Sequence, residues 1–198
     1  MNNLIILGNG FDLSHGMKTS YGDFITWMIE EHCKDRTKFR KILRIPDLIV
    51  DSDDFFYNLS HSPLKLLVST GKKSKGSTVQ MPFNSSFFEK LILEKANKGT
   101  WADIEAFYFS QLNDRLEEIG VKKLNREFED LKEALQEYLR TEEQKDTEMN
   151  ETFQYIFNSL CTDTSVVLNF NYTDTVERLY KDEITETDLI HIHGELFA

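Results

Sequence analysis

Three short apolar runs lie at the two ends of the chain, and each predicts a β-strand. Residues 4–7 (LIIL) form a continuous apolar run that ends in glycine, which is typical of a strand buried on both faces of a parallel sheet. Residues 166–170 (VVLNF) and 189–193 (LIHIH) are the other two predicted strands. The sheet is therefore expected to combine the beginning and the end of the sequence.

The region between these strands has apolar residues at helical spacing. Ser20 and Asp23 have capping-box spacing, and Ser86 and Glu89 repeat it, so a helix is predicted to begin at each serine. Gly120 is predicted to end the helix that begins near residue 100. The predicted helices after the first one lie near residues 86–99, 100–120, 124–138 and 149–160.

These elements predict one α/β domain over residues 1–198. Its parallel-sheet core comes from about residues 1–20 and 163–198, and a large, mostly helical insertion occupies about residues 35–162. A chain of 198 residues, of which 40% are hydrophobic, is long and apolar enough for one well-buried core.

Charge and cysteine content narrow the classes of function. The net charge is −11, so no broad positive surface is expected for a nucleic acid or an anionic membrane. Cys33 and Cys161 have no CxxC spacing, which argues against structural zinc and favours a reducing compartment. The first apolar run is too short for a signal peptide or a membrane span, so a soluble, cytoplasmic protein is expected.

The first predicted strand ends in a glycine turn suited to binding phosphate. At Gly8, Asn9 and Gly10 the backbone amides can approach an anion, as in nucleotide-binding turns between a strand and a helix. However, Leu13 occupies the third glycine position of the dehydrogenase motif, and the next glycine is Gly16. A plain tight turn therefore stays an alternative.

The second predicted strand ends in a polar segment, residues 169–174 (NFNYTD). Ligands of open α/β sheets bind at such carboxyl ends of strands. Asn171 can exchange hydrogen bonds with a sugar hydroxyl or a water molecule, or it can serve as a turn residue. Asp174 and Glu177 have capping-box spacing, which favours a role in starting a short helix.

The third predicted strand carries two histidines on the same face, His191 and His193. Both rings could bind one metal ion together with Asp12, Asp174 or Glu105, as in a metal-dependent nuclease or phosphohydrolase. Alternatively, one histidine could act as a general base, or the rings could simply pack. The spacing alone leaves these interpretations open.

Four segments together resemble the bacteriophage abortive-infection AbiH family. They are GNGFDLSHGMKTSY at residues 8–21, WADIE at 101–105, FNYT at 170–173 and HIHG at 191–194. The resemblance spans Leu4 to Leu196 and implies a role in phage defence. Because members of that family commonly continue well beyond the HG pair, this chain is expected to be a truncated or divergent member.

The order of these motifs is also similar to that of sirtuin-type NAD-binding domains. Gly8, Gly10 and Gly16 have the spacing of the sirtuin glycine loop. Asp12 stands where the sirtuin motif has serine, and Thr173 stands where it has aspartate. The resemblance implies a Rossmann-like, sirtuin-type sheet that binds NAD or a related nucleotide.

The same resemblance implies roles for the site residues. His193 is the expected catalytic base, and Asn171 is expected to position a water molecule or the ribose. Asp12 is the candidate to stabilise an oxocarbenium-like ribose during cleavage. The residues expected to bind the nucleotide are Gly8, Asn9, Gly10, Phe11, Gly16, Tyr172 and Thr173.

The implied function is that of a phage-defence effector that binds NAD or a related nucleotide, with hydrolysis of the nicotinamide–ribose bond as the implied reaction. Without a CxxC pair, zinc-dependent peptide deacetylation is a poor fit and no zinc is expected. The expected partner is a small nucleotide, and a homo-oligomer or an unidentified phage or defence partner stays open. The alternatives are a metal-dependent nuclease or phosphohydrolase and a non-catalytic binding or sensor protein.

Overall fold

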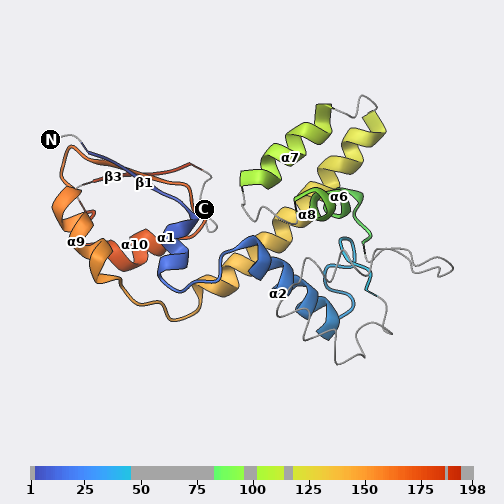
Figure 1. Cartoon of the computed structure of the whole chain (residues 1–198), viewed down its shortest axis with the longest axis horizontal. Helices are drawn as coiled ribbons and strands as arrows, with labels where there is room; N and C mark the ends of the chain where they lie inside the picture. The colour runs from blue at the N-terminus through green and yellow to red at the C-terminus, as the bar shows by residue number, and fades with distance from the viewer. Residues whose placement is uncertain (1–2, 46–82, 96–101, 114–117, 186, 193–198) are drawn as a thin grey trace. The chain divides into compact units, whose positions relative to one another are not determined.

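The computed structural model describes residues 3–45, 83–95, 102–113, 118–185 and 187–192 (Figure 1). The chain divides into two compact units. The sheet unit comprises Met1–Thr19 and Gln136–Ala198, and the helical unit comprises Ser20–Leu135. The boundary falls within the long helix α8 (Glu118–Glu143). That the whole chain acts as a single domain stays a prediction.

Three short strands form a parallel sheet in the sheet unit. They are β1 (Leu4–Leu7), β2 (Val166–Asn169) and β3 (Asp188–His191), in the order β1-β2-β3. The register pairs Leu7 with Asn169 and Asn169 with His191, so all three carboxyl ends lie at one edge. The predicted mixed α/β fold and its three strands are confirmed, with strand boundaries shifted by one or two residues.

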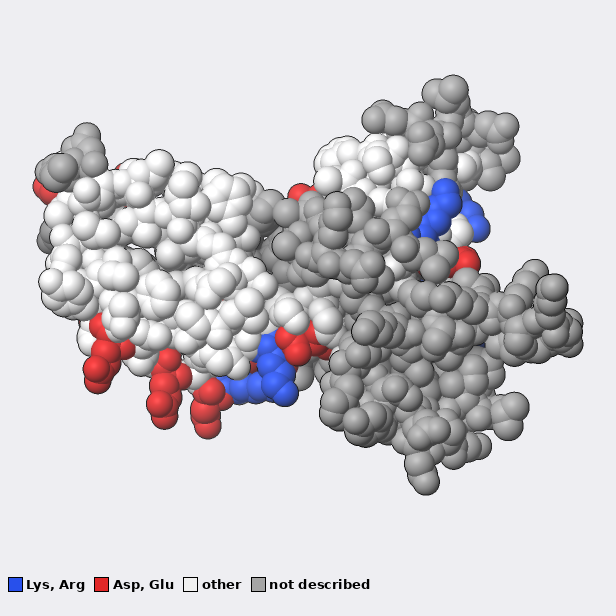
Figure 2. Space-filling model, in the orientation of Figure 1, with Lys and Arg blue, Asp and Glu red and all other residues white. Residues whose placement is uncertain are grey.

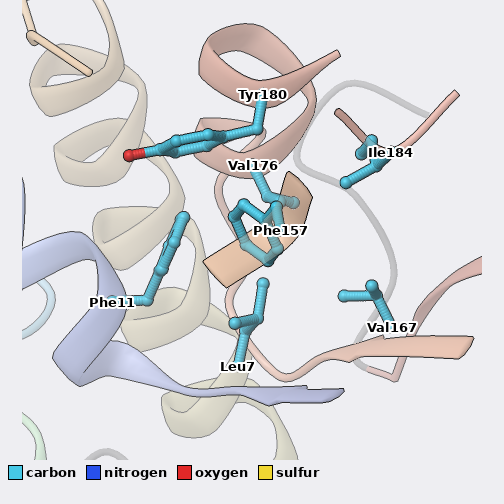
Figure 3. Packing of buried hydrophobic residues seen from close by; sticks show 7 residues of the cluster. All are labelled: Leu7, Phe11, Phe157, Val167, Val176, Tyr180 and Ile184. Carbon is cyan, nitrogen blue, oxygen red and sulfur yellow. The ribbon is translucent and has the colours of Figure 1, made fainter. Parts of the chain in front are cut away.

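One face of the sheet is covered by α1 (Asn9–Ser14), α9 (Glu151–Leu160) and α10 (Thr175–Tyr180) (Figure 1). Apolar side chains from these helices meet those of the strands in one buried cluster (Figure 3). Its members are Leu7, Phe11, Phe157, Val167, Val176, Tyr180 and Ile184. This cluster holds the helices against the sheet and thereby fixes the positions of the loops that follow β1 and β2.

The opposite face of the sheet is open to solvent. Leu4 and Ile6 are each 63% exposed, and Ile190 is 47% exposed. Successive strand residues point to opposite faces, so Leu7 is buried while Ile6 is not. The prediction that residues 4–7 are buried on both faces is therefore wrong. Figure 2 shows a mainly uncharged surface over the strands of this unit.

The helical unit contains α2 (Tyr21–Lys34), α6 (Ser86–Lys95), α7 (Ala102–Asn113) and the first part of α8. The predicted start of α2 is confirmed, because Ser20 is its N-cap and the Ser20 Oγ accepts a hydrogen bond from the Asp23 amide at 3.2 Å. This bond satisfies one of the amides that a helix leaves without an internal partner at its start.

The start of α6 differs by one residue from the prediction. The Oγ of Ser85 accepts from the Phe88 amide at 3.1 Å, so Ser85 takes the capping role that was expected of Ser86. The amides of Ser86 and Phe87 donate instead to the buried carboxylate of Glu127 on α8, at 3.2 and 2.8 Å. A side chain from a distant element thus completes the cap, and helical periodicity carries no signal for such a contact.

The prediction that Gly120 ends a helix is wrong. The helix that precedes it, α7, ends at Asn113, and Gly120 is the third residue of α8. Glycine weakens a helix less in the first turn, where amides have no internal partner, than in the interior. Leu124, Leu131 and Tyr138 are all buried and recur every seven residues, so one apolar stripe continues along a single long helix.

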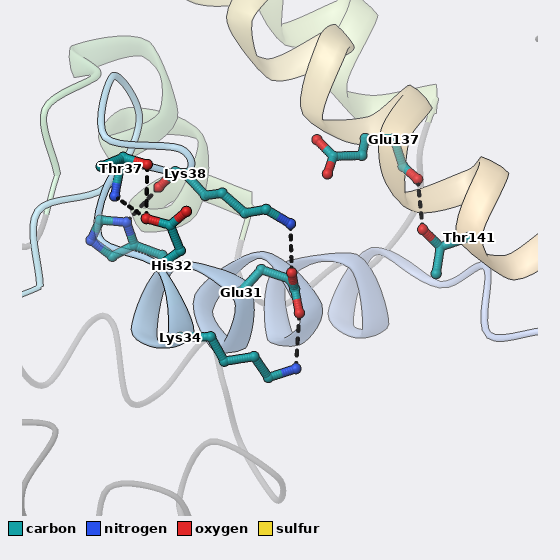
Figure 4. Close-up of polar contacts among 8 residues, drawn as sticks. Glu31, His32, Lys34, Thr37, Lys38, Glu137 and Thr141 are labelled. Atoms are coloured by element: carbon teal, nitrogen blue, oxygen red, sulfur yellow. Dashed lines mark hydrogen bonds and ion pairs between the residues drawn. The ribbon is translucent and has the colours of Figure 1, made fainter.

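Charged side chains surround the end of α2 (Figure 4). Glu31 accepts from Lys34 at 2.8 Å and from Lys38 at 2.7 Å, and these two bonds lower the pKa of its carboxyl. A nitrogen of the buried His32 ring lies 2.6 Å from the Lys38 carbonyl oxygen. Exposed ion pairs of this kind contribute about 1 kcal/mol or less, so we interpret them as local support for the turn.

Truncation of the sheet-unit core is expected to destabilise the fold strongly. Phe157 is fully buried and packs against Phe11 and Tyr180, whereas Tyr155 on the same helix is 73% exposed. We expect Phe157→Ala to lower the free energy of unfolding by about 3–5 kcal/mol. We expect Tyr155→Ala to change it by about 0.5 kcal/mol or less. Urea denaturation followed by circular dichroism measures both, and similar losses would contradict this description of the core.

Candidate functional site

The carboxyl edge of the sheet brings together two of the predicted segments. Gly8 follows β1 and is the N-cap of α1, and the segment Asn171–Thr173 follows β2. Because β1 and β2 are parallel neighbours with Leu7 opposite Asn169, both segments leave the sheet at the same end. This is the edge at which open α/β sheets bind their ligands.

Asp12 lies in the first turn of α1 and is only 1% exposed. Its Oδ2 accepts a hydrogen bond from the Thr173 hydroxyl at 2.7 Å, which ties α1 to the segment after β2. Its Oδ1 is buried and has no hydrogen-bond partner among the described residues. Burial raises the pKa of this carboxyl, and the threonine hydroxyls of Thr173 and Thr175 oppose the rise.

Asn171 is the second predicted residue that the structure places at this edge. The residue is 4% exposed, and its backbone amide donates to the Asn169 Oδ1 at 2.9 Å. The Nδ2 group is buried and makes no hydrogen bond within the described part of the chain. Buried donors and acceptors in proteins are usually paired, so Asp12 and Asn171 are exceptions that call for a ligand or a water molecule.

Glu143 is a site residue that the sequence interpretation missed. It is the last residue of α8, and its Oε1 accepts from the Asp174 amide at 3.0 Å, at the start of α10. Burial raises its pKa to about 7, and the negative charges of Asp174 and Asp12 add to the rise. Its Oε2 is buried without a hydrogen-bond partner in the described residues. No motif marks this glutamate, which lies in the charged stretch TEEQKD.

The predicted capping box of Asp174 and Glu177 is wrong in its contacts. Asp174 does occupy the N-cap position of α10, but its side chain makes no capping hydrogen bond. Its Oδ1 lies 3.5 Å from the Nε of Arg178, and Glu177 bonds to the Nε2 of His191 on β3. Asp174 thus forms an ion pair and Glu177 bonds to an imidazole, and Glu143 accepts from the Asp174 amide instead. The Asp174 Oδ1 and the Glu177 Oε2 are themselves buried without a hydrogen-bond partner among the described residues.

The three glycines of the turn differ in whether the backbone conformation requires glycine at their positions. Gly16 has a φ of +77°, a left-handed conformation that favours glycine. Gly8 has an extended backbone, and Gly10 lies inside α1. A Cβ added at either of these two positions would meet no atom of the described residues within 4 Å. Neither backbone strain nor packing against the described part of the chain therefore requires glycine at residues 8 and 10.

The remaining predicted nucleotide-binding residues have contacts within the protein. Asn9 accepts from the Thr19 hydroxyl at 2.6 Å, and Tyr172 is half-buried. Phe11 is 4% exposed and belongs to the buried cluster of the sheet unit (Figure 3). Its ring centroid lies 4.9 Å from that of Phe153, which packs against this cluster. The contacts shown by the Phe11 ring are those of core packing, and its role toward a nucleotide stays a prediction.

His193, the predicted catalytic base, lies outside the described residues, and so does Trp101 of the WADIE segment. Glu105 belongs to α7 in the helical unit and is half-exposed. Among the residues that the structure describes, no group of three or more histidine, cysteine, aspartate or glutamate side chains is arranged to hold a metal ion. Within the same residues, no helix is both long enough and apolar enough to cross a membrane.

Comparison with known proteins gives one family. The family model described as "Bacteriophage abortive infection AbiH" matches residues 4–198. No curated protein and no solved structure gives a significant match.

The carboxyl of Glu143 is expected to make stability depend on pH. Its pKa rises from 4.5 in an open chain to about 7 in the fold, so the folded state keeps a proton that the unfolded state loses. The stability of the protein should therefore fall, relative to that of Glu143→Gln, as pH rises from 4.5 to 7. We expect a difference on the order of 1 kcal/mol, because water near a half-buried carboxyl screens its interactions.

Urea denaturation of both proteins at several pH values measures this difference. Glutamine keeps the acceptor for the Asp174 amide and does not titrate, so the capping contact is matched. A difference in unfolding free energy that stays constant between pH 4.5 and 7 would contradict the raised pKa of Glu143.

Proposed function

Because the chain belongs to the bacteriophage abortive infection AbiH family, we propose that it is a phage-defence protein whose sheet unit binds NAD or a related nucleotide. The nucleotide would bind at the carboxyl edge of the sheet, against the loops that follow β1 and β2. Hydrolysis of its nicotinamide–ribose bond is the reaction that we propose, since loss of NAD would stop growth of an infected cell.

The observation that carries this proposal is a pair of buried polar groups that have no hydrogen-bond partner among the described residues. The Asp12 Oδ1 is an acceptor, and the Asn171 Nδ2 is a donor. Each such group typically costs about 1–3 kcal/mol when it is buried without a partner. Two of them on adjacent strand-end segments support a binding site for a polar ligand, because a ligand with hydroxyl groups can satisfy both.

The two glycines of the turn add separate support. Gly8 and Gly10 precede Asp12 by four and two residues, and packing against the described residues requires glycine at neither position. Glycine at such positions lets another molecule approach the backbone closely. Close approach of a nucleotide to the turn would explain why both positions are glycine.

In the proposed reaction, the oxygen of a water molecule bonds to C1′ of the ribose. The bond from C1′ to the nicotinamide nitrogen breaks, and its electron pair stays on that nitrogen. Asp12 would stabilise the positive charge that develops on the ribose, and Asn171 would position the water. The proton that the water releases would go to a base, for which His193 stays the prediction.

The other two interpretations differ in what they require. A metal-dependent nuclease needs a cluster of ligands, and the described residues contain no group suited to holding a metal ion. A non-catalytic sensor would use the same site to bind the nucleotide and would release no nicotinamide. The next experiment therefore separates the sensor from the hydrolase.

Removal of the proposed site residues is expected to abolish nicotinamide release. Purified protein is incubated with NAD, and free nicotinamide is quantified by chromatography. We expect Asn171→Ala, Asp12→Asn and His193→Ala each to lower the rate by 100-fold or more, roughly the contribution of one positioned catalytic group. The matched control is Asn158→Ala, which alters an exposed asparagine of α9 and should keep the full rate. Equal rates for all the proteins would rule out this assignment of the site.

Gly10→Ala is expected to weaken nucleotide binding without destabilising the fold. Alanine favours a helix more than glycine, and the added Cβ meets no atom of the residues that the structure describes, so stability should stay the same or rise by up to about 1 kcal/mol. The increase in melting temperature that NAD causes in the unchanged protein should become smaller. The control is Gly22→Ala, because Gly22 is likewise the second residue of its helix, α2. An unchanged NAD response in Gly10→Ala would place the ligand away from the turn.

A further inference from the structure

Three separate elements contribute buried polar atoms to the candidate site. Asp12 comes from α1, Asn171 from the segment after β2, and Glu143 from the end of α8. One atom of each side chain is buried without a hydrogen-bond partner in the described part of the protein: the Oδ1 of Asp12, the Nδ2 of Asn171 and the Oε2 of Glu143. Two of these atoms are acceptors, and the third is a donor.

The chemistry of these atoms selects the part of a nucleotide that they can bind. Phosphate oxygens only accept hydrogen bonds, and two carboxylates would repel them. Arg178, whose charge acts on both Asp12 and Glu143, already lies 3.5 Å from Asp174, and α1 is a short helix of six residues with little capacity to hold an anion by itself. A hydroxyl group, in contrast, can donate to a carboxylate and accept from an amide at the same time.

We propose that Glu143 is a ligand-binding residue that, together with Asp12, accepts hydrogen bonds from the 2′- and 3′-hydroxyls of a ribose. This inference rests on the proposed nucleotide site and names the group that the site recognises. The Asn171 amide would donate to one of the same hydroxyl oxygens. The phosphates of the nucleotide would then extend away from the carboxylates.

The capping contact of Glu143 holds its carboxylate in place while one oxygen accepts a hydrogen bond from the ribose. Its Oε1 is held by the Asp174 amide at 3.0 Å, which fixes the end of the side chain and leaves the Oε2 for the ligand. Asp12 is arranged in the same way, since its Oδ2 is held by Thr173 at 2.7 Å. Each carboxylate thus has one oxygen bound to the protein and the other without a partner among the described residues, which is a preorganised arrangement for two hydroxyls.

The test compares two ligands on two proteins by isothermal titration calorimetry at pH 8, above the pKa of Glu143. The ligands are NAD and its analogue that lacks the 2′- and 3′-hydroxyls on both riboses. In the unchanged protein we expect NAD to bind at least tenfold more tightly than the analogue, because hydrogen bonds to charged groups are strong. In Glu143→Gln the ratio of the two affinities should fall to about threefold or less. The control Glu148→Gln, which alters an exposed glutamate of the same unit, should keep the full ratio.

The ratio of the affinities for NAD and the analogue distinguishes recognition of the ribose hydroxyls by Glu143 from a purely structural role. If Glu143 only supported the fold, the substitution would weaken both ligands equally and leave the ratio unchanged, and that result would overturn this inference alone. Equal binding of NAD and the analogue by the unchanged protein would also overturn the inference that the ribose hydroxyls are recognised. It would leave the proposal of a nucleotide-binding site intact. Binding of neither ligand would overturn the proposed nucleotide site and this inference with it. If Glu143→Gln does not fold, Asp12→Asn replaces it with the same expected loss of discrimination.

Discussion

The hydrogen bond from Thr173 to Asp12 is the contact on which the candidate site depends. Its partners are 161 residues apart in the sequence, and they meet because β1 and β2 are parallel neighbours in register. The bond keeps Asp12 inside the protein, where burial raises the pKa of its carboxyl. Through its charge, Asp12 also raises the pKa of Glu143, so a third element becomes part of the same electrostatic environment.

Most elements of the fold follow from local patterns in the sequence. The three apolar runs predicted the strands, and Ser20 with Asp23 predicted the start of α2, because these signals depend on neighbouring residues alone. The errors arose where a distant element decides the outcome. Whether residues 4–7 are covered on one face or on both depends on which helices pack there, and the continuation of α8 through Gly120 depends on its buried stripe.

The sequence also identified only some of the residues of the candidate site. Asn171 was identified by its position after a predicted strand and Asp12 by the resemblance to the sirtuin motif. The structure places both as buried groups at one edge of the sheet, and their roles toward a ligand stay predictions. Glu143 had no signal, since its role comes from the place where a 26-residue helix ends. The contacts of Asp174 and Glu177 were also beyond a spacing argument, because Arg178 and His191 compete for carboxylates that could otherwise cap α10.

The strands β1 and β2 pair in the fold but are synthesised at different times, because they lie far apart in the sequence. At about 5–20 residues per second, a ribosome needs on the order of 10–30 s to make the residues between the two strands. During that time β2, the strand that pairs with β1 in the described sheet, has not yet been made. The edge that carries Asp12 and Asn171 can be assembled only after β2 and the segment that follows it have been made, so a nascent chain that has not reached β2 lacks the site.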